Sequence, residues 1–88
     1  MQSELLQRIE RAAAAGQPAP KDLRPPEAML YYMLFGLYAS YHAGKINKLQ
    51  GHEHKTQIYK IYNRMNDDYH QFTEICKLYQ QRIKEGVE

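Results

Sequence analysis

The chain has 88 residues, a length that predicts one domain spanning 1–88, and 43% of them are hydrophobic, which excludes a disordered chain. Its formal net charge of +2 is too small to indicate a nucleic-acid or membrane partner by itself. The only cysteine, Cys76, excludes an intrachain disulfide and is typical of a reducing compartment, so we expect a cytoplasmic protein.

The first expected helix covers residues 3–15. Ser3 is a suitable N-cap, and apolar residues from Leu5 to Ala13 recur on one side. Gly16 ends this helix, and the prolines that follow prevent its continuation. We therefore expect residues 16–24 to form a proline-stiffened linker.

The second expected helix covers residues 26–43 and begins at the pair of prolines before Glu27. Proline suits a first helical turn, and a carboxylate there favours the positive end of the helix dipole. Gly44 supplies the left-handed residue that ends the helix.

Residues 28–43 contain no charged side chain, and apolar residues fall on every side of the helix they would form. Such a helix must be enclosed, because water on any face would leave apolar area exposed. One face carries a leucine stripe and another carries a strip of small residues, namely Gly36, Ala39, Ser40 and Ala43. The run is shorter than the roughly 20 residues that span a bilayer, so we expect no membrane anchor.

The third expected helix covers residues 48–85, with Asn47 and Gln50 forming a capping box. Apolar residues then follow an alternating spacing of four and three, at Ile58, Tyr62, Met65, Tyr69, Phe72, Cys76, Tyr79 and Ile83. A continuous helix of this span would be about 57 Å long. Residues 66–68 favour helix caps, so a break of the helix there is the alternative. The apolar seam, however, keeps its phase through these residues.

These elements predict an all-α fold, a small helical bundle in which two shorter helices pack on a long C-terminal helix. We expect the second helix to fold back antiparallel on residues 48–66 and the first helix to cover part of residues 67–83. So short a chain leaves apolar helix surface uncovered, which predicts a homo-oligomer, most simply a dimer, or another protein partner.

Catalytic and metal-binding patterns are weak. His52 and His54 flank Glu53, but residues two apart point in different directions on a helix, so they could share a metal only if this turn is not helical. Cys76 falls on the apolar seam, where a cysteine is usually a small core residue. We predict no metal, no cofactor and no enzymatic activity.

Residues 44–64 carry five basic side chains against one acidic one, a local net charge of +4. Basic groups beside an accessible ring can hold a phosphate backbone or a phosphate-bearing small molecule. The candidate residues for this ligand or nucleic-acid site are Lys48, Lys55, Tyr59, Lys60 and Arg64. A solvated helix face is the simpler interpretation of so modest a charge.

Several short stretches carry a family resemblance, namely Leu23-Arg24-Pro25-Pro26-Glu27, Tyr32, Leu37-Tyr38, Tyr41 and Gly44-Lys45-Ile46. With them the chain resembles small all-helical proteins encoded by phages and prophages of Gram-positive gut bacteria. That family has no established activity, so the resemblance assigns no functional residues. It implies action on a host protein, including defence factors such as CRISPR effectors, or sequestration of a nucleotide signal.

The sequence therefore predicts a non-enzymatic, phage-encoded binding protein that acts by protein–protein contact, as an inhibitor of a host defence factor. Its eight tyrosines support this interpretation, because tyrosine suits interfaces. The candidate contact residues are Tyr31, Phe35, Tyr38 and Tyr59. The alternative is an oligomeric protein that binds a nucleotide signal or nucleic acid through residues 44–64.

Overall fold

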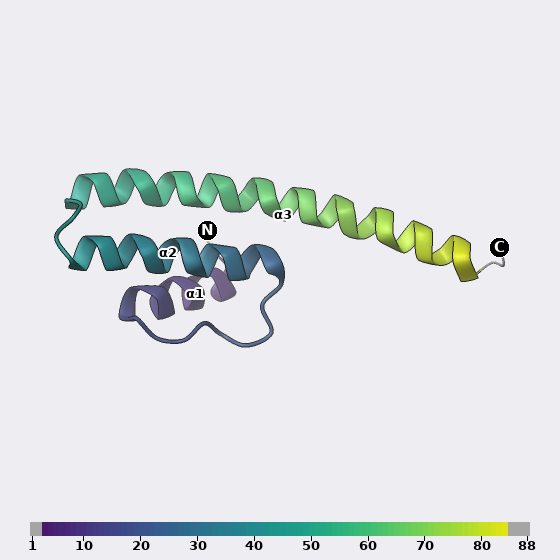
Figure 1. The fold of residues 1–88 in the computed structure, drawn as a ribbon, viewed down its shortest axis with the longest axis horizontal. Helices are drawn as coiled ribbons and strands as arrows, with labels where there is room; N and C mark the ends of the chain where they lie inside the picture. The colour runs from purple at the N-terminus through teal and green to yellow at the C-terminus, as the bar shows by residue number, and fades with distance from the viewer. Residues whose placement is uncertain (1–2, 85–88) are drawn as a thin grey trace.

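The structure, a computed structural model, describes the backbone of residues 3–84 and side chains as far as residue 81. It contains three helices, α1 (Glu4–Ala15), α2 (Pro25–His42) and α3 (Lys48–Lys84), and no strand in the described range (Figure 1). The predicted fold class is confirmed: the chain is all-α, with two shorter helices packed beside a long C-terminal one.

The helix ends follow the local signals in the sequence. The Ser3 hydroxyl accepts a hydrogen bond from the Leu6 N–H at 3.2 Å, and Gly16 closes α1 in the left-handed conformation with φ 69°. At the start of α3, the Gln50 N–H donates to Asn47 Oδ1 at 2.8 Å, and the Asn47 N–H donates to Gln50 Oε1 at 3.0 Å. This reciprocal pair is the capping box that the sequence predicts.

Helices α2 and α3 form an antiparallel hairpin, as predicted (Figure 1). Gly44 adopts φ 75° just after α2, which lets the chain reverse direction over residues 43–47. The leucines of α2 face α3 and α1 and form the centre of the core with Tyr62. Within the described residues, no helix is long and apolar enough to cross a membrane.

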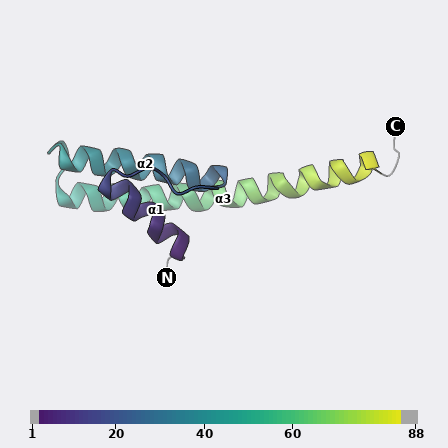
Figure 2. The ribbon, with the colours of Figure 1, turned by 90° about the horizontal axis from the view of Figure 1, so that it is seen from below.

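Helix α3 is continuous through Asn66, Asp67 and Asp68, as the unbroken phase of the seam predicts, and the alternative break does not occur. Its 37 residues correspond to about 56 Å at 1.5 Å per residue. Helix α2 has 18 residues and covers only the first half of α3. Residues 67–84, here called the projecting segment, extend beyond the start of α2 with no other helix beside them (Figures 1 and 2).

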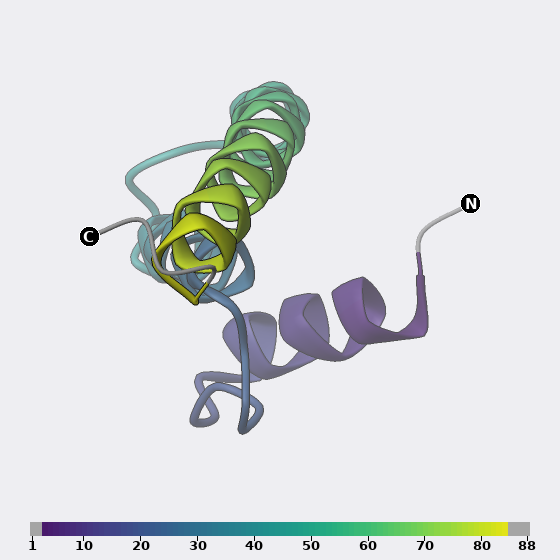
Figure 3. The same ribbon diagram turned by 90° about the vertical axis from the view of Figure 1, so that its right-hand side faces the viewer.

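Helix α1 does not cover the projecting segment, and the sequence-based expectation on this point is wrong. It packs against α2 on one side of the hairpin and crosses it obliquely (Figures 2 and 3). Its apolar stripe of Ile9, Ala12 and Ala13 is buried there. The alanines permit a close approach to α2, and the hydrogen bonds that Glu10 accepts from Tyr38 and Tyr59 fix the position.

Candidate protein interface

A buried carboxylate fastens the start of α2 to the middle of α3. Glu27 is only 1% exposed, and its two carboxylate oxygens accept hydrogen bonds of 2.7 Å from Nε and Nη2 of Arg24. The Tyr62 hydroxyl donates to Glu27 Oε2 at 2.8 Å, and Arg24 Nη2 also donates to Asn66 Oδ1 at 2.8 Å. The Arg24 guanidinium lies 5.8 Å from the centroid of the Tyr69 ring. This cluster marks the end of the cover that α2 provides.

The Glu27 cluster keeps its carboxylate ionised. Burial alone would raise the pKa of Glu27, but the hydrogen bonds from Arg24 and Tyr62 outweigh it and hold that pKa below its ordinary value. Burial and the bond to Glu27 raise the pKa of Tyr62, which stays a neutral donor. The buried charge is therefore fully paired.

A second carboxylate fastens α1 to both other helices. Glu10 accepts hydrogen bonds from the Tyr38 hydroxyl at 2.9 Å and the Tyr59 hydroxyl at 2.7 Å, and it forms an ion pair with Lys55. Burial would raise the pKa of Glu10, but these three donors lower it below its ordinary value. The bond and charge of Glu10 in turn raise the pKa of Lys55.

Three of the four predicted contact residues are used inside the molecule. Tyr31 is 7% exposed, and its hydroxyl donates to the Gln17 carbonyl at 2.6 Å. Tyr38 and Tyr59 are half-buried and donate to Glu10. Phe35, at 40% exposed, is the most accessible of the four. The contact role of all four stays a prediction.

Sequence reasoning missed Glu10 as the acceptor for Tyr38 and Tyr59, and Glu27 as the acceptor for Tyr62. The available signal was the presence of very few carboxylates on two helices, Glu4 and Glu10 on α1 and Glu27 on α2, in a small chain with many tyrosines. A buried hydroxyl needs a partner, and a buried carboxylate needs several donors, so the two residue types satisfy each other.

The side of α2 that faces away from both neighbours remains exposed. Its residues, here called the outer face of α2, are Met29, Tyr32, Phe35, Gly36 and Ala39. None is charged, and Tyr32 is 67% exposed. A Cβ atom added at Gly36 would meet nothing within 4 Å. The small residues in the middle of this face allow another helix to approach closely.

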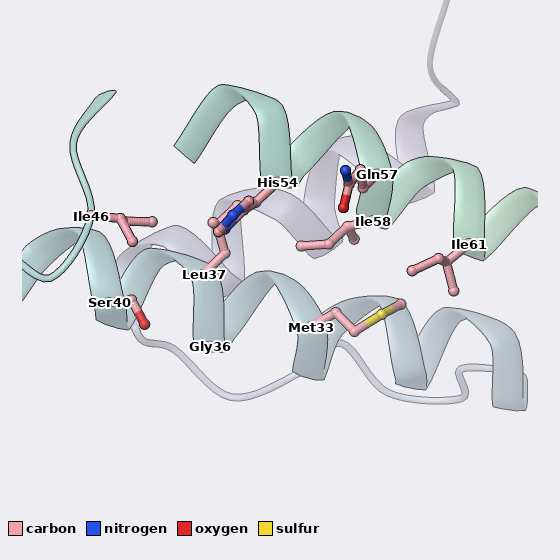
Figure 4. Close-up of a pocket in the computed structure, with 9 residues that line it drawn as sticks. All are labelled: Met33, Gly36, Leu37, Ser40, Ile46, His54, Gln57, Ile58 and Ile61. Atoms are coloured by element: carbon pink, nitrogen blue, oxygen red, sulfur yellow. The ribbon is translucent and has the colours of Figure 1, made fainter. Parts of the chain in front are cut away.

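An apolar groove of about 440 Å³ lies between α2 and α3, next to the outer face of α2. Ile58 and Ile61 on α3 point toward α2, where Met33 and Gly36 form the opposite wall (Figure 4). The remaining lining residues are Leu37, Ser40, Ile46, His54 and Gln57. Because Gly36 belongs to both, the groove and the outer face of α2 form one continuous, largely apolar surface.

The predicted basic site is only partly assembled. Lys55, Tyr59 and Lys60 line one surface hollow of about 410 Å³, and Lys48 lines a neighbouring hollow with Lys55. Arg64 lines neither of the two. The Lys55 charge is already paired with Glu10, so this hollow offers less positive charge than the sequence suggested.

His52 and His54 lie within α3. The turn that carries them is therefore helical, and the non-helical turn that a shared metal would require is not present. His52 lines the hollow beside Lys55, whereas His54 lines the apolar groove. Within the part of the chain that the structure describes, no three His, Cys, Asp or Glu side chains are grouped closely enough to hold a metal ion.

Comparisons with known proteins do not add a family or a fold neighbour. A scan against known protein families, a search of curated proteins and a search of solved structures each found no match.

Proposed function

We propose that this chain is a non-enzymatic binding protein that acts by protein–protein contact through the outer face of α2 and the adjoining groove. The observation that carries the proposal is the uncharged outer face itself, which neither α1 nor α3 covers. Soluble monomers rarely expose contiguous apolar patches of more than a few hundred Å², and larger ones mark interaction sites.

The composition of this surface suits a protein helix as the partner. Tyr32 and Phe35 supply exposed rings, which are enriched at protein interfaces. Gly36 and Ala39 lie about one turn further along the same face and let a partner backbone approach. The groove wall formed by Met33 and Ile61 would then receive the partner's apolar side chains.

The family resemblance gives this proposal its specific form. We propose that the chain is phage-encoded, works in the host cytoplasm and inhibits a host defence factor such as a CRISPR effector. Blocking a protein surface needs no catalytic group, which is consistent with a binding role.

The test is a comparison of variants in a host pull-down, followed by reconstitution with the purified partner. Gly36→Arg places a long charged side chain on the outer face, at a position where an added Cβ atom meets nothing within 4 Å. Wild type should capture a specific host protein, and Gly36→Arg and Tyr32→Arg should weaken its capture by at least about tenfold.

Gln7→Arg is the matched control, because it adds the same charge at an exposed position on α1. It should capture the partner as wild type does. A wild-type protein that captures nothing, or a partner that both Gly36→Arg and Gln7→Arg retain equally, would overturn the proposal.

Binding of a nucleotide signal or nucleic acid is the second candidate, because Lys55, Tyr59 and Lys60 line one hollow. We rank it lower because Glu10 neutralises Lys55. Titration of a labelled oligonucleotide or cyclic dinucleotide at several salt concentrations tests it. Salt-sensitive binding that Lys48→Glu with Lys60→Glu abolishes would support this function over protein contact.

A further inference from the structure

The projecting segment has no other helix beside it (Figures 1 and 2), and its large apolar side chains are exposed. Phe72 is 64% exposed and Tyr79 is 62% exposed, and Ile75 and Leu78 are also more than half exposed. Most of the stability of a helix in a protein comes from packing its apolar face against a neighbour. Exposed rings on such a helix therefore call for a partner.

The position of that partner follows from the seam of α3. Ile58 and Tyr62 pack against the buried core that α2 contributes. Phe72 and Tyr79 continue the same spacing of four and three residues, so they face the space directly beyond the first turn of α2. A helix there would continue the line of α2 and pack antiparallel to α3 at a spacing of about 8–10 Å.

We propose that a second copy of this chain fills that space with its own projecting segment, antiparallel and related by a two-fold axis near residue 75. Each copy supplies a segment of the same length, about 27 Å, so the two overlap fully and each end reaches the partner's α2 start. The overlap of the two segments ends at the Arg24–Asn66 contact, because α2 covers α3 up to that point. A two-fold pair buries the same stripe on both copies and forms a closed dimer.

The charge pattern of the segment permits this self-pairing. The stripe itself is uncharged and consists of Tyr69, Phe72, Ile75, Cys76 and Tyr79. Glu74 and Lys77 lie off it and pair with each other at 3.8 Å. These two charged side chains therefore do not oppose the pairing of one stripe with its copy.

The area of the stripe sets the strength of the dimer. A fully buried Phe or Tyr side chain removes roughly 150–250 Å² from water. With the exposed fractions of Phe72, Ile75 and Tyr79, these three side chains of both copies would together bury on the order of 700 Å². Stable interfaces bury about 1,200–2,000 Å². We therefore expect a reversible dimer with a dissociation constant in the micromolar range.

Sedimentation velocity over a range of concentrations tests the dimer with the full chain. Wild type should shift from monomer to dimer, and Phe72→Lys combined with Tyr79→Lys should weaken this association by at least about tenfold. Tyr32→Lys, on the outer face of α2, is the control and should dimerise as wild type does. The double variant should keep the unfolding transition of the bundle, because neither ring belongs to the core.

Cysteine cross-linking tests the orientation. Cys76 lies beside the proposed axis, so a short bis-maleimide should link two wild-type chains. In a Cys76→Ser background, Tyr69→Cys should cross-link to Tyr79→Cys, whereas two Tyr69→Cys chains are offset by about 18 Å along the axis and should not. A wild type that stays monomeric, a Tyr69→Cys chain that links efficiently to itself, or capture of a different protein by Phe72 and Tyr79 would each overturn the proposal.

Discussion

The two halves of α3 share one apolar pattern but have different surroundings. In residues 48–66, the seam is covered by α2, and Tyr62 donates to the buried carboxylate of Glu27. In residues 67–84, the same spacing continues, yet Phe72 and Tyr79 are exposed. The apolar seam therefore determines which side of α3 needs a packing partner. The length of α2 determines how many residues of that seam are covered within one chain.

The largest expected contrast comes from shortening one leucine in each region. Leu34 is completely buried between α2 and its neighbours, so Leu34→Ala should lower the free energy of unfolding by about 3 kcal/mol through lost burial and a cavity. Leu78→Ala on the projecting segment should change it by less than about 0.5 kcal/mol. Urea unfolding at low protein concentration measures both, and similar losses would contradict the division of α3 into two regions.

Removing one carboxylate charge from each region should give a smaller contrast. Glu27→Gln weakens the bonds from Arg24 and Tyr62 at a buried site, so we expect a loss of about 2 kcal/mol. This figure allows for the exposure of the Arg24 side chain, which is 51% exposed. Glu74→Gln removes the exposed pair with Lys77 and should cost less than about 0.5 kcal/mol. Equal effects in thermal unfolding would show that the Glu27 cluster does not anchor the hairpin.

The pH dependence of unfolding should follow the two buried carboxylates. The pKa values of Glu10 and Glu27 lie below the ordinary 4.5 in the folded chain, so their stabilisation is complete above that value and is lost as pH falls through the lowered pKa. Stability measured by urea unfolding should therefore be flat down to about pH 5 and then fall. In Glu27→Gln this acid-side decrease should be shallower, and an unchanged slope would argue against the assignment.

At alkaline pH the sign reverses. The pKa values of Tyr38 and Tyr62 lie above the ordinary 10.0, and that of Lys55 lies above 10.5. Stabilisation by these groups is complete below those ordinary values and is lost as pH rises through the raised pKa. Stability measured by urea unfolding at higher pH should therefore decline only above about pH 10.

The smallest expected effect concerns the helix propensity of the projecting segment. The Thr73 hydroxyl donates to the Tyr69 carbonyl at 2.8 Å, and alanine is the stronger helix former, so Thr73→Ala should stabilise this helix by about 0.5 kcal/mol. Hydrogen exchange should show slower exchange in residues 69–81 and no change in residues 48–66. Equal changes in both halves would mean that α3 unfolds as one unit.

Local signals in the sequence predicted the helices well. Ser3, Gly16, Gly44 and the Asn47–Gln50 box each act within one turn of the chain, so neighbouring residues alone determine them. The unbroken phase of the seam also predicted the continuity of α3 through residues 66–68. The antiparallel hairpin followed because the two helices are adjacent in the chain and share apolar stripes.

Contacts between distant residues were not predictable in the same way. The stripe of Ile9, Ala12 and Ala13 fits any apolar groove of suitable width, and the linker does not fix where α1 is placed. The position of α1 depends on Glu10 accepting hydrogen bonds from two different helices. Several tyrosines that suggested a partner surface donate hydrogen bonds inside the molecule. By contrast, Gly36 and Ala39 of the small-residue strip lie on the exposed outer face of α2.

The anchoring of α1 has a consequence for the order of assembly. Only residues 43–47 connect α2 to α3, so closing this hairpin costs little chain entropy. The donors to Glu10 come from both arms, Tyr38 on one and Lys55 and Tyr59 on the other, so Glu10 has all its partners only when the hairpin is closed. We therefore expect α1 to gain its full set of polar contacts only on a correctly registered hairpin.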